Sequence, residues 1–388
     1  MSFRSRAAIV GVGELAPVKY TEEESTLDLM VRVGLDAVDD AGIGFDEIDG
    51  LLVHPVGGIS MLVPSTLVEL LGMKVRFAET VDLGGATGAA MVWRAAQAIA
   101  SGMCESCLCI TASRRGRGRS YGIEGMQDRS AYAEFEVPFG AVGANFGYAQ
   151  IATRYQHEYG VAPETLAEIA VSQRDNACLN PAAFFHGQPI SVDDVLASPM
   201  IVDPLHLLEI VMPVGGGAAL LVTSAEKAKS LAQPPAFILG AGEHVTHKSI
   251  TYAPDLCHSA VTAAAESAFA MAGVGPEQIG LASLYDCYTI TVLLTLEDAG
   301  FCDKGEGGRF VEEHDLRAGG DFPLNTHGGQ LSFGQAGIAG GTSHVTEAAR
   351  QVQGRCGERQ IKDLEFAFVN GNGGIMSEQA SLVLGANP

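Results

Sequence analysis

The sequence is poor in positive charge. Its 388 residues carry 24 lysines and arginines against 46 aspartates and glutamates, which gives a formal net charge of −22 at pH 7. The phosphates of nucleic acids and of anionic membrane surfaces would be repelled by such a chain. The composition therefore argues against nucleic acid and membrane as partners.

Long hydrophobic runs are also missing. No uninterrupted apolar stretch approaches the roughly 20 residues that a membrane-spanning helix needs. The first residues, Met1–Arg6, lead into a short strand-like run and contain no hydrophobic core of a secretory signal. We therefore expect a cytoplasmic protein.

The eight cysteines do not form a disulfide framework in a chain of this length. Cys104, Cys107 and Cys109 lie close together, but no second pair follows at the spacing of a four-ligand zinc site. The segment from Cys107 to Thr111 is typical of a buried strand, in which thiols act as small apolar groups. Because the ten histidines are scattered as well, we predict no metal site.

Apolar residues and glycine are abundant. Hydrophobic residues make up 47% of the chain, and there are 48 glycines. These fractions indicate a globular protein with a large core and many tight turns. The length allows two domains or one fused pair of domains.

Strands and helices alternate along the chain, which predicts mixed sheets covered by helices. Ser25 with Asp28 predicts the start of a helix that ends at Gly42. Strands are expected at 7–12, 51–54, 107–111 and 218–222, and further helices at 146–159 and 162–176.

One stretch predicts a strand end, a glycine elbow and a buried helix. Gly84 and Gly85 form the elbow, and the helix over Ala86–Ala100 contains only three strongly polar or charged side chains. The start of such a helix presents unpaired backbone N–H groups, and glycine lets a ligand approach them closely. The elbow therefore suits an oxyanion or a nucleophile, although a purely structural turn is the alternative.

Residues 112–150 break the periodic pattern. They carry four arginines with no acid between them, at positions Arg114, Arg115, Arg117 and Arg119. A long excursion of this kind commonly covers a site, and we expect it to line a ligand pocket. Arg114 and Arg115 are our candidates for binding phosphate groups, because guanidinium binds phosphate bidentately. A solvated basic loop is the alternative.

The chain repeats itself. The segment Ala8–Glu14 recurs as Phe237–Glu243, about 230 residues later, and in each case a helix and a second strand follow. Duplication of this kind implies two halves of one design that pack face to face. We place the N-terminal half at 1–235, with an excursion at about 112–215, and the C-terminal half at 236–388.

Four motifs in the same order resemble the thiolase superfamily, most closely the sterol carrier protein thiolase branch. The resemblance covers residues from about 7 to 385 and implies a layered αβαβα fold with a mixed five-stranded sheet in each half. The four motifs are Gly84-Gly85-Ala86-Thr87-Gly88, Tyr285-Asp286-Cys287-Tyr288, Gly328-Gly329 followed by Gly334-Gln335-Ala336, and Gly371-Asn372-Gly373-Gly374.

The departures from this resemblance decide the chemistry. Gly85 stands where thiolases have the nucleophilic cysteine, and Gln335 stands where they have the activating histidine. Glycine cannot carry an acyl group, and a carboxamide takes no proton near neutral pH. What remains is an electrostatic site that can stabilise a thioester enolate through backbone N–H groups at Gly85, Gly373 and Gly374.

The resemblance then points to the lipid-transfer-protein-type acyl-CoA aldolases. It implies retro-aldol cleavage of a 3-hydroxyacyl-CoA, with coenzyme A present only as part of the substrate and no other cofactor. Tyr285, followed by Asp286, or His327 is expected to move the hydroxyl proton, and Cys287 is the candidate acid for the enolate. The side-chain amide of Gln335 is expected to contribute a hydrogen bond to the enolate oxygen.

Two other functions remain open at this point. The chain could be an acyltransferase that uses Cys287 as a displaced nucleophile, or a non-catalytic acyl-CoA-binding subunit. The resemblance also implies a homodimer and a small partner with a zinc ribbon and an OB-fold. The apolar strands near 77–81 and 107–111 support the homodimer, because we expect them to be exposed in a monomer.

Overall fold

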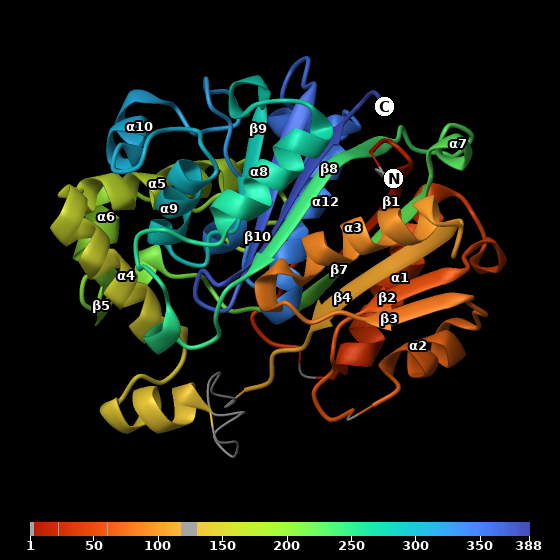
Figure 1. Cartoon of the computed structure of the whole chain (residues 1–388), viewed down its shortest axis with the longest axis horizontal. Helices are drawn as coiled ribbons and strands as arrows, with labels where there is room; N and C mark the ends of the chain where they lie inside the picture. Colours follow the sequence, from red (N-terminus) through yellow and green to blue (C-terminus); the bar gives the residue numbers. More distant parts are fainter. Residues whose placement is uncertain (1–3, 22, 60, 118–129) are drawn as a thin grey trace.

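The computed structural model describes residues 4–21, 23–59, 61–117 and 130–388 (Figure 1). Its main sheet has nine strands in the order β3-β2-β4-β7-β1-β8-β11-β10-β9. The strands are β1 Ala7–Glu14, β2 Gly50–Val53, β3 Phe77–Thr80, β4 Ser106–Ser113, β7 Gly216–Ser224, β8 Ala236–Val245, β9 Leu281–Leu284, β10 Phe366–Gly373 and β11 Glu378–Gly385, with β5 Met200–Val202 and β6 Leu205–His206 in a separate hairpin.

The helices alternate with strands, as predicted, only in part of the chain. They are α1 Thr26–Ala41, α2 Val63–Leu71, α3 Thr87–Ala100, α4 Ala144–Tyr159, α5 Pro163–Cys178, α6 Val192–Ala197, α7 Ala225–Ala228, α8 Val261–Ala272, α9 Thr289–Asp298, α10 Gly307–Glu313, α11 Gly329–Ser332 and α12 Gly340–Val352. The Ser25 hydroxyl and the Asp28 carboxylate form the predicted capping box of α1, and Gly42 ends it in the left-handed conformation. In the described part of the chain, none of these helices has both the length and the apolar character to cross a membrane.

The two halves of the sheet share one strand order and one set of directions. In the first half, β2 runs parallel to β3 and β4, whereas β4, β7 and β1 pair antiparallel in turn. In the second half, β9 runs parallel to β10, whereas β10, β11 and β8 pair antiparallel in turn. The halves join where β1 pairs with β8, at Ala8–Phe237 and Ile9–Ala236.

The C-terminal half contributes four strands to this sheet, not the five that we predicted. A short extended segment around Leu324 lies where the fifth strand was expected, and it makes a parallel bridge to Ala282 of β9. Pro323 has no N–H to donate, and Asn325 turns the chain away with a φ of 49°. The segment therefore ends before it can form a strand.

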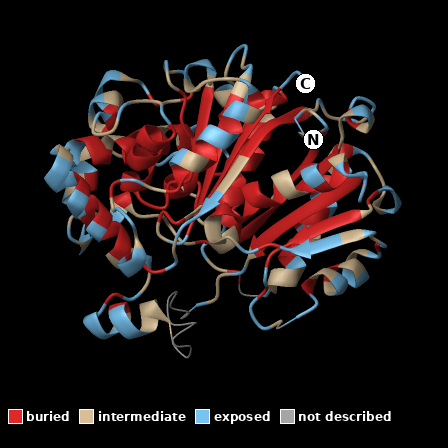
Figure 2. Ribbon diagram, viewed as in Figure 1, coloured by how far each residue is buried: buried red, intermediate tan, exposed pale blue. Residues whose placement is uncertain are grey.

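Helices α3 and α12 lie between the two halves, and this confirms the predicted layers. Alternate residues of each strand face opposite sides. Ile9 of β1 and Ile238 of β8 pack in the same cluster as α3 and α12, whereas Val10 and Leu239 pack on the other face with α1 and α8. Figure 2 shows most strands of the sheet buried, whereas the edge strand β3 is exposed, and the other exposed surface lies mainly on the outer helices and loops.

The repeated glycines bring the first strand of each half against its covering helix. Gly11 and Gly13 of β1 face α1, and Gly240 and Gly242 of β8 face α8. A Cβ atom added at any of the four would come within 2.0–2.2 Å of a helix carbonyl oxygen, those of Ala37, Val33, Ala268 and Ala264. The repeated glycines thus allow the same close contact between a strand and its covering helix in both halves.

The reasoning from strand exposure to a homodimer is only partly correct. Residues 107–111 lie inside the sheet as β4, between β2 and β7, and are buried without a partner subunit. Strand β3 does form the sheet edge, and Ala78, Glu79 and Thr80 are exposed there. Only β3 remains an argument for pairing with a second copy.

Candidate active site

The glycine elbow and the turn after β10 lie against each other. Gly84–Ala86 form a short 3-10 turn that leads directly into α3. A Cβ atom at Gly84 would lie 3.2 Å from Gly373 Cα, and one at Gly373 would lie 2.1 Å from Leu83 O. The structure therefore brings together the backbone groups of Gly85, Gly373 and Gly374 that we predicted for an oxyanion.

The ring of Tyr285 fills the space next to the elbow where a nucleophile would project. A Cβ atom at Gly85 would lie 2.3 Å from Tyr285 Cε2 and 2.4 Å from Asn372 O. On the other side, α12 packs so closely that a Cβ atom at Gly341 would lie 1.8 Å from Gly85 O. Gly85 is thus required by its neighbours, and the elbow has no room for a cysteine.

The hydroxyl group of Tyr285 accepts a hydrogen bond from the side chain of Gln335. The amide Nε2 of Gln335 lies 3.0 Å from the phenolic oxygen. The backbone of Gln335 is fixed by two further bonds, to Met212 O and from Val214 N, both 2.9 Å. Because Gln335 donates this bond, the phenol proton remains available to another acceptor. Burial raises the pKa of Tyr285 above its ordinary value, so the phenol is protonated at neutral pH.

Asp286 has a positioning role in this arrangement. Its carboxylate is fully buried and accepts backbone bonds from Gln330 N at 2.7 Å and Leu331 N at 3.1 Å, at the start of α11. A Cβ atom at Gly329 would lie 2.1 Å from Asp286 Oδ2. Asp286 therefore fixes the segment that carries Gln335.

His344 is a site residue that the sequence reasoning missed. It lies on α12 and is fully buried, with Nε2 3.2 Å from Asp286 Oδ1 and Nδ1 3.2 Å from Ser283 Oγ. Its ring centroid lies 6.0 Å from that of Tyr285. No motif marks His344, because its place in the site comes from the packing of α12.

His327 lies behind the site. Its Nε2 is 3.3 Å from Ser343 Oγ, and its ring packs against Phe333 and His344. Burial lowers the pKa of His327 well below its usual value, so the imidazole is neutral. Among the contacts of the described residues, none joins His327 to Tyr285 or Gln335.

Cys287 is buried next to the turn that contains Gly373 and Gly374. Its Sγ lies 4.0 Å from Asn372 Nδ2, and its carbonyl accepts a bond from Val211 N. Burial raises the pKa of the Cys287 thiol to about 12. The thiol therefore stays protonated near neutral pH, which makes it a poor nucleophile and leaves it a proton to donate.

Helix α4 of the excursion reaches the same turn through Tyr148, which we did not predict. The Tyr148 hydroxyl donates to Gly374 O at 3.1 Å and accepts from Asn372 Nδ2 at 2.9 Å. Its ring stacks on that of Tyr288 with centroids 4.3 Å apart. The excursion thus holds the turn in place.

The two predicted arginines line a cavity beside the site. This cavity has a volume of about 460 Å³, and its wall includes Arg114, Arg115, Gly337 and Ile338, the last two directly after the Gln335 segment. Arg114 is exposed, whereas the Arg115 guanidinium donates to Pro213 O. Arg119 lies outside the described residues. Within the described ranges, no group of three or more histidine, cysteine or acidic side chains could hold a metal ion.

Comparisons with known proteins identify the family. Residues 242–386 match the family described as thiolase C-terminal domain-like. The chain is 35% identical to a "Steroid side-chain-cleaving aldolase" of Thermomonospora curvata over 98% of both chains. It is 30% identical to a "17-hydroxy-3-oxo-4-pregnene-20-carboxyl-CoA lyase" of Mycobacterium tuberculosis, covering 98% of this chain and 99% of the relative. A solved structure, "Ltp2-ChsH2(DUF35) aldolase", superposes with a TM-score of 0.90 at 33% identity, covering 100% of this chain and 99% of that one.

The chain belongs to the thiolase superfamily. Within it, the chain is an acyl-CoA aldolase of the branch related to sterol carrier protein thiolase. The fold and the resemblance that the four motifs predicted are both confirmed.

Proposed function

We infer that the site cleaves the C2–C3 bond of a 3-hydroxyacyl-CoA by a retro-aldol reaction. The electron pair of this bond stays on C2 as a thioester enolate, and C3 becomes the carbonyl carbon of the leaving product. Backbone N–H groups at Gly85 and Gly374 are the proposed donors to the enolate oxygen. The reaction is redox-neutral, so the only cofactor we propose is the coenzyme A of the substrate.

Tyr285 is the proposed proton-transfer residue. The phenol of Tyr285 is protonated, so it can accept the proton of the 3-hydroxyl only if it gives up its own proton in the same step. That phenol proton goes to C2 of the enolate. The charge of the phenol is then the same before and after the step. C2 takes up only one proton, so the protonated thiol of Cys287 is the alternative donor of that proton; the 3-hydroxyl proton, passed on by Tyr285, then restores the thiol. Gln335 orients the phenolic oxygen.

The observation that carries this proposal is the Tyr285 ring in the space of the missing nucleophile. An acyl-enzyme cannot form at Gly85, whereas a phenol at that point faces the reacting carbons of a bound thioester. Incubation with a 3-hydroxyacyl-CoA should give a carbonyl compound and a shorter acyl-CoA in equal amounts by mass spectrometry. If no 3-hydroxyacyl-CoA of any chain size is cleaved, the proposal is wrong.

We expect Cys287 to form no acyl adduct. With a thiol pKa of about 12, only a minute fraction is thiolate near pH 7. The intact mass of the protein should therefore not rise after incubation with acetyl-CoA. A stable acetyl group that maps to Cys287 would favour the acyltransferase alternative instead.

Replacing Arg114 by alanine should weaken binding of coenzyme A esters most strongly at low salt. Arg114 is exposed at its cavity, and phosphate contacts of an exposed arginine are screened by salt. Replacing Arg115 as well should add a loss of turnover, since its guanidinium supports Pro213 next to Gln335. The exposed Arg309, which pairs with Glu306 and Glu313, is a matched control. Equal affinities at low salt would leave Arg114 as a solvated side chain.

We further propose that the chain forms a homodimer through β3. The outer edge of β3 is exposed, and two copies related by a two-fold axis could pair there. Light scattering at micromolar concentration should give twice the mass of the chain. A monomer at that concentration would contradict the proposal.

A small partner subunit is the remaining proposal. The similar solved structure is named as a complex with ChsH2(DUF35), which supports it. We expect a zinc-ribbon and OB-fold protein to raise the activity of this chain. Full activity of the isolated chain would argue against such a partner.

A further inference from the structure

The hydroxyl group of Tyr148 lies where three parts of the site meet. It donates to Gly374 O at 3.1 Å and accepts from Asn372 Nδ2 at 2.9 Å. It also shares a hydrogen bond with the sulfur of Cys287, which is 4.0 Å from the same Asn372 Nδ2. One hydroxyl group thus joins the thiol to the turn of Gly373 and Gly374, which we call the oxyanion turn.

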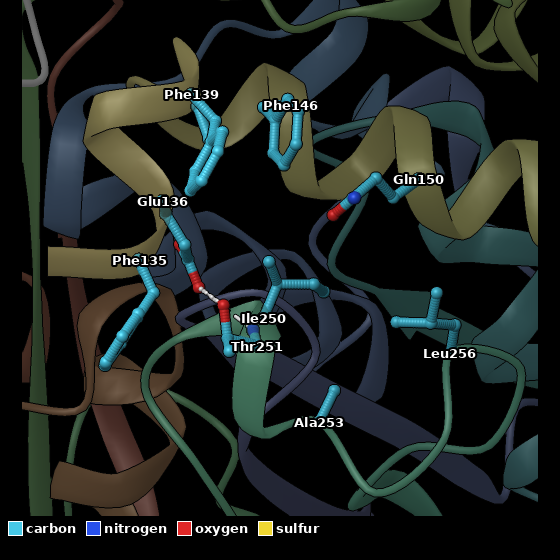
Figure 3. Close-up of a pocket in the computed structure, with 10 residues that line it drawn as sticks. Phe135, Glu136, Phe139, Phe146, Gln150, Ile250, Thr251, Ala253 and Leu256 are labelled. Atoms are coloured by element: carbon cyan, nitrogen blue, oxygen red, sulfur yellow. Dashed lines mark hydrogen bonds between the residues drawn. The ribbon is translucent and has the colours of Figure 1, made fainter. Parts of the chain in front are cut away.

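Helix α4 directs Tyr148 toward the site through the spacing of its residues. Phe146 and Gln150, four residues apart, share the face of α4 that lines a cavity with Ile250 (Figure 3). Tyr148 is midway between them in the sequence, so its side chain leaves the helix on the opposite face. There its ring is buried and stacks on that of Tyr288.

The excursion is fixed to the body of the protein on both sides of this helix turn. Before α4, Glu136 is 4% exposed, and its Oε1 accepts from the backbone N–H and the hydroxyl of Thr251, each at 2.9 Å (Figure 3). Within α4, Gly147 packs so closely on Ile375 that a Cβ atom at the glycine would lie 2.3 Å from Ile375 Cδ1. The fold therefore sets the position of the Tyr148 hydroxyl relative to the oxyanion turn.

The contacts of the Cys287 sulfur favour a group that gives up a proton. Donation of the thiol proton leaves a thiolate, and a buried negative charge is costly unless hydrogen bonds stabilise it. Burial raises the pKa of the Cys287 thiol to about 12, and hydrogen bonds with Tyr148 and Thr291 oppose this increase. The Asn372 amide is a further donor beside the same sulfur. A thiol that only filled apolar space would need none of these polar neighbours.

We propose that Tyr148 is a positioning residue for protonation of the enolate: its hydroxyl holds the Cys287 sulfur beside the oxyanion turn, so that the thiol protonates C2 from one face. The inference rests on the proposed retro-aldol reaction and selects the second of its two proton donors. The S–H bond of Cys287 breaks as the C2–H bond forms, and the thiolate then takes the 3-hydroxyl proton that Tyr285 passes on. The excursion thus contributes one hydroxyl group to the chemistry.

Hydrogen exchange at C2 of propionyl-CoA in deuterium oxide tests the proposal without C–C cleavage. The Cys287 thiolate can remove one C2 hydrogen and return a deuteron, while the oxyanion turn stabilises the enolate. At about pH 9, where the thiolate fraction is larger than at pH 7, the chain with any subunit that co-purifies should exchange faster than free propionyl-CoA. Because a fixed sulfur reaches one face only, mass spectrometry should show uptake of a single deuterium.

Tyr148→Phe should slow this exchange by about tenfold or more, because the thiolate loses a hydrogen bond. The affinity for propionyl-CoA should stay within about threefold. Part of the exchanged ester should carry two deuterium atoms, since the sulfur is no longer held at one face. Cys287→Ala should abolish the exchange, whereas Tyr285→Phe should keep its rate within about threefold.

Tyr159→Phe is the matched control, because it removes a hydroxyl group from the last residue of the same helix. It should leave the exchange rate and the product mass unchanged. Tyr148→Phe keeps the stacked ring, and thermal unfolding checks its fold. If it does not fold, Tyr148→3-fluorotyrosine retains the hydroxyl as a stronger donor and should speed up the exchange, and an unchanged rate would then overturn the proposal.

Exchange by Tyr148→Phe at the parent rate would refute the role of Tyr148, and cleavage of 3-hydroxyacyl-CoA esters by the same protein would leave the proposed reaction standing. Exchange that survives Cys287→Ala but is lost in Tyr285→Phe would also overturn the inference, as would a parent protein that exchanges no faster than free propionyl-CoA. Conversely, single exchange that depends on Tyr148, in a protein that cleaves no 3-hydroxyacyl-CoA, would support the inference and refute the reaction.

Discussion

Replacing Tyr285 by phenylalanine should lower kcat for C–C cleavage by about 100-fold or more, with little change in stability. The substitution removes one hydroxyl and leaves the ring that fills the space beside Gly85. Gln335, which donates a hydrogen bond to this hydroxyl, is half-buried and can turn to solvent. Single-turnover cleavage of a 3-hydroxyacyl-CoA measures the effect on chemistry, and binding of an uncleavable ester shows whether the pocket is intact.

Tyr288→Phe is the control for the loss of a buried hydroxyl. Tyr288 lies three residues further, stacks on Tyr148 and donates to Asn145 instead of Gln335. Its variant should lose less than about tenfold in kcat. Near-native cleavage by Tyr285→Phe would remove Tyr285 from the mechanism, and His327 would be the next residue to test.

The pH dependence gives an independent reading of the same role. Because burial raises the pKa of Tyr285, its phenol keeps its proton throughout the neutral range. We expect kcat to show no decline attributable to Tyr285 up to about pH 10, the ordinary tyrosine value. An alkaline decline near pH 7 that disappears in Tyr285→Phe would show a phenol that titrates in that range.

Gly85→Ala should abolish most of the activity and destabilise the fold. The added Cβ atom would lie within 2.4 Å of both the Tyr285 ring and Asn372 O, so the ring or the turn must move. Overpacking of this kind costs about 1–3 kcal/mol, and displacement of the phenol should lower kcat by about 100-fold or more. Gly85→Cys should do the same and should not yield a thiolase, because Gln335 cannot take the thiol proton.

Gly319→Ala is the matched control, because no heavy atom lies within 4 Å of a Cβ atom at that position. A double-mutant cycle then identifies the clashing partner: in a Tyr285→Ala background, Gly85→Ala should cost less stability. If Gly85→Ala is as stable and as active as the parent, the close contact with Tyr285 is not part of the working site.

Part of the element order was predictable from the sequence. Short apolar runs, the capping box at Ser25 and the duplicated glycine motif each have a local cause, so several strands, α1 and the repeat were predicted. The four motifs located the elbow, Tyr285, Gln335 and the final glycine turn, and the structure brings these together.

Other features depend on contacts between distant parts of the chain. His344 and Tyr148 join the site through the packing of α12 and α4, and nothing in their local sequence signals it. His327 was predicted as the alternative to Tyr285 for proton transfer, and its Nε2 lies 3.3 Å from Ser343 Oγ. The missing fifth strand of the second half also depends on two neighbouring residues, Pro323 and Asn325.

The contact between Gly85 and Tyr285 also limits how this protein can evolve. To regain a nucleophilic cysteine, a descendant must first replace Tyr285 with a smaller side chain, and it must then convert both Gly85 and Gln335. Each single step on this path lowers the present activity before any thiolase activity arises. A change from the present site to a thiolase site therefore needs substitutions at Tyr285, Gly85 and Gln335 together.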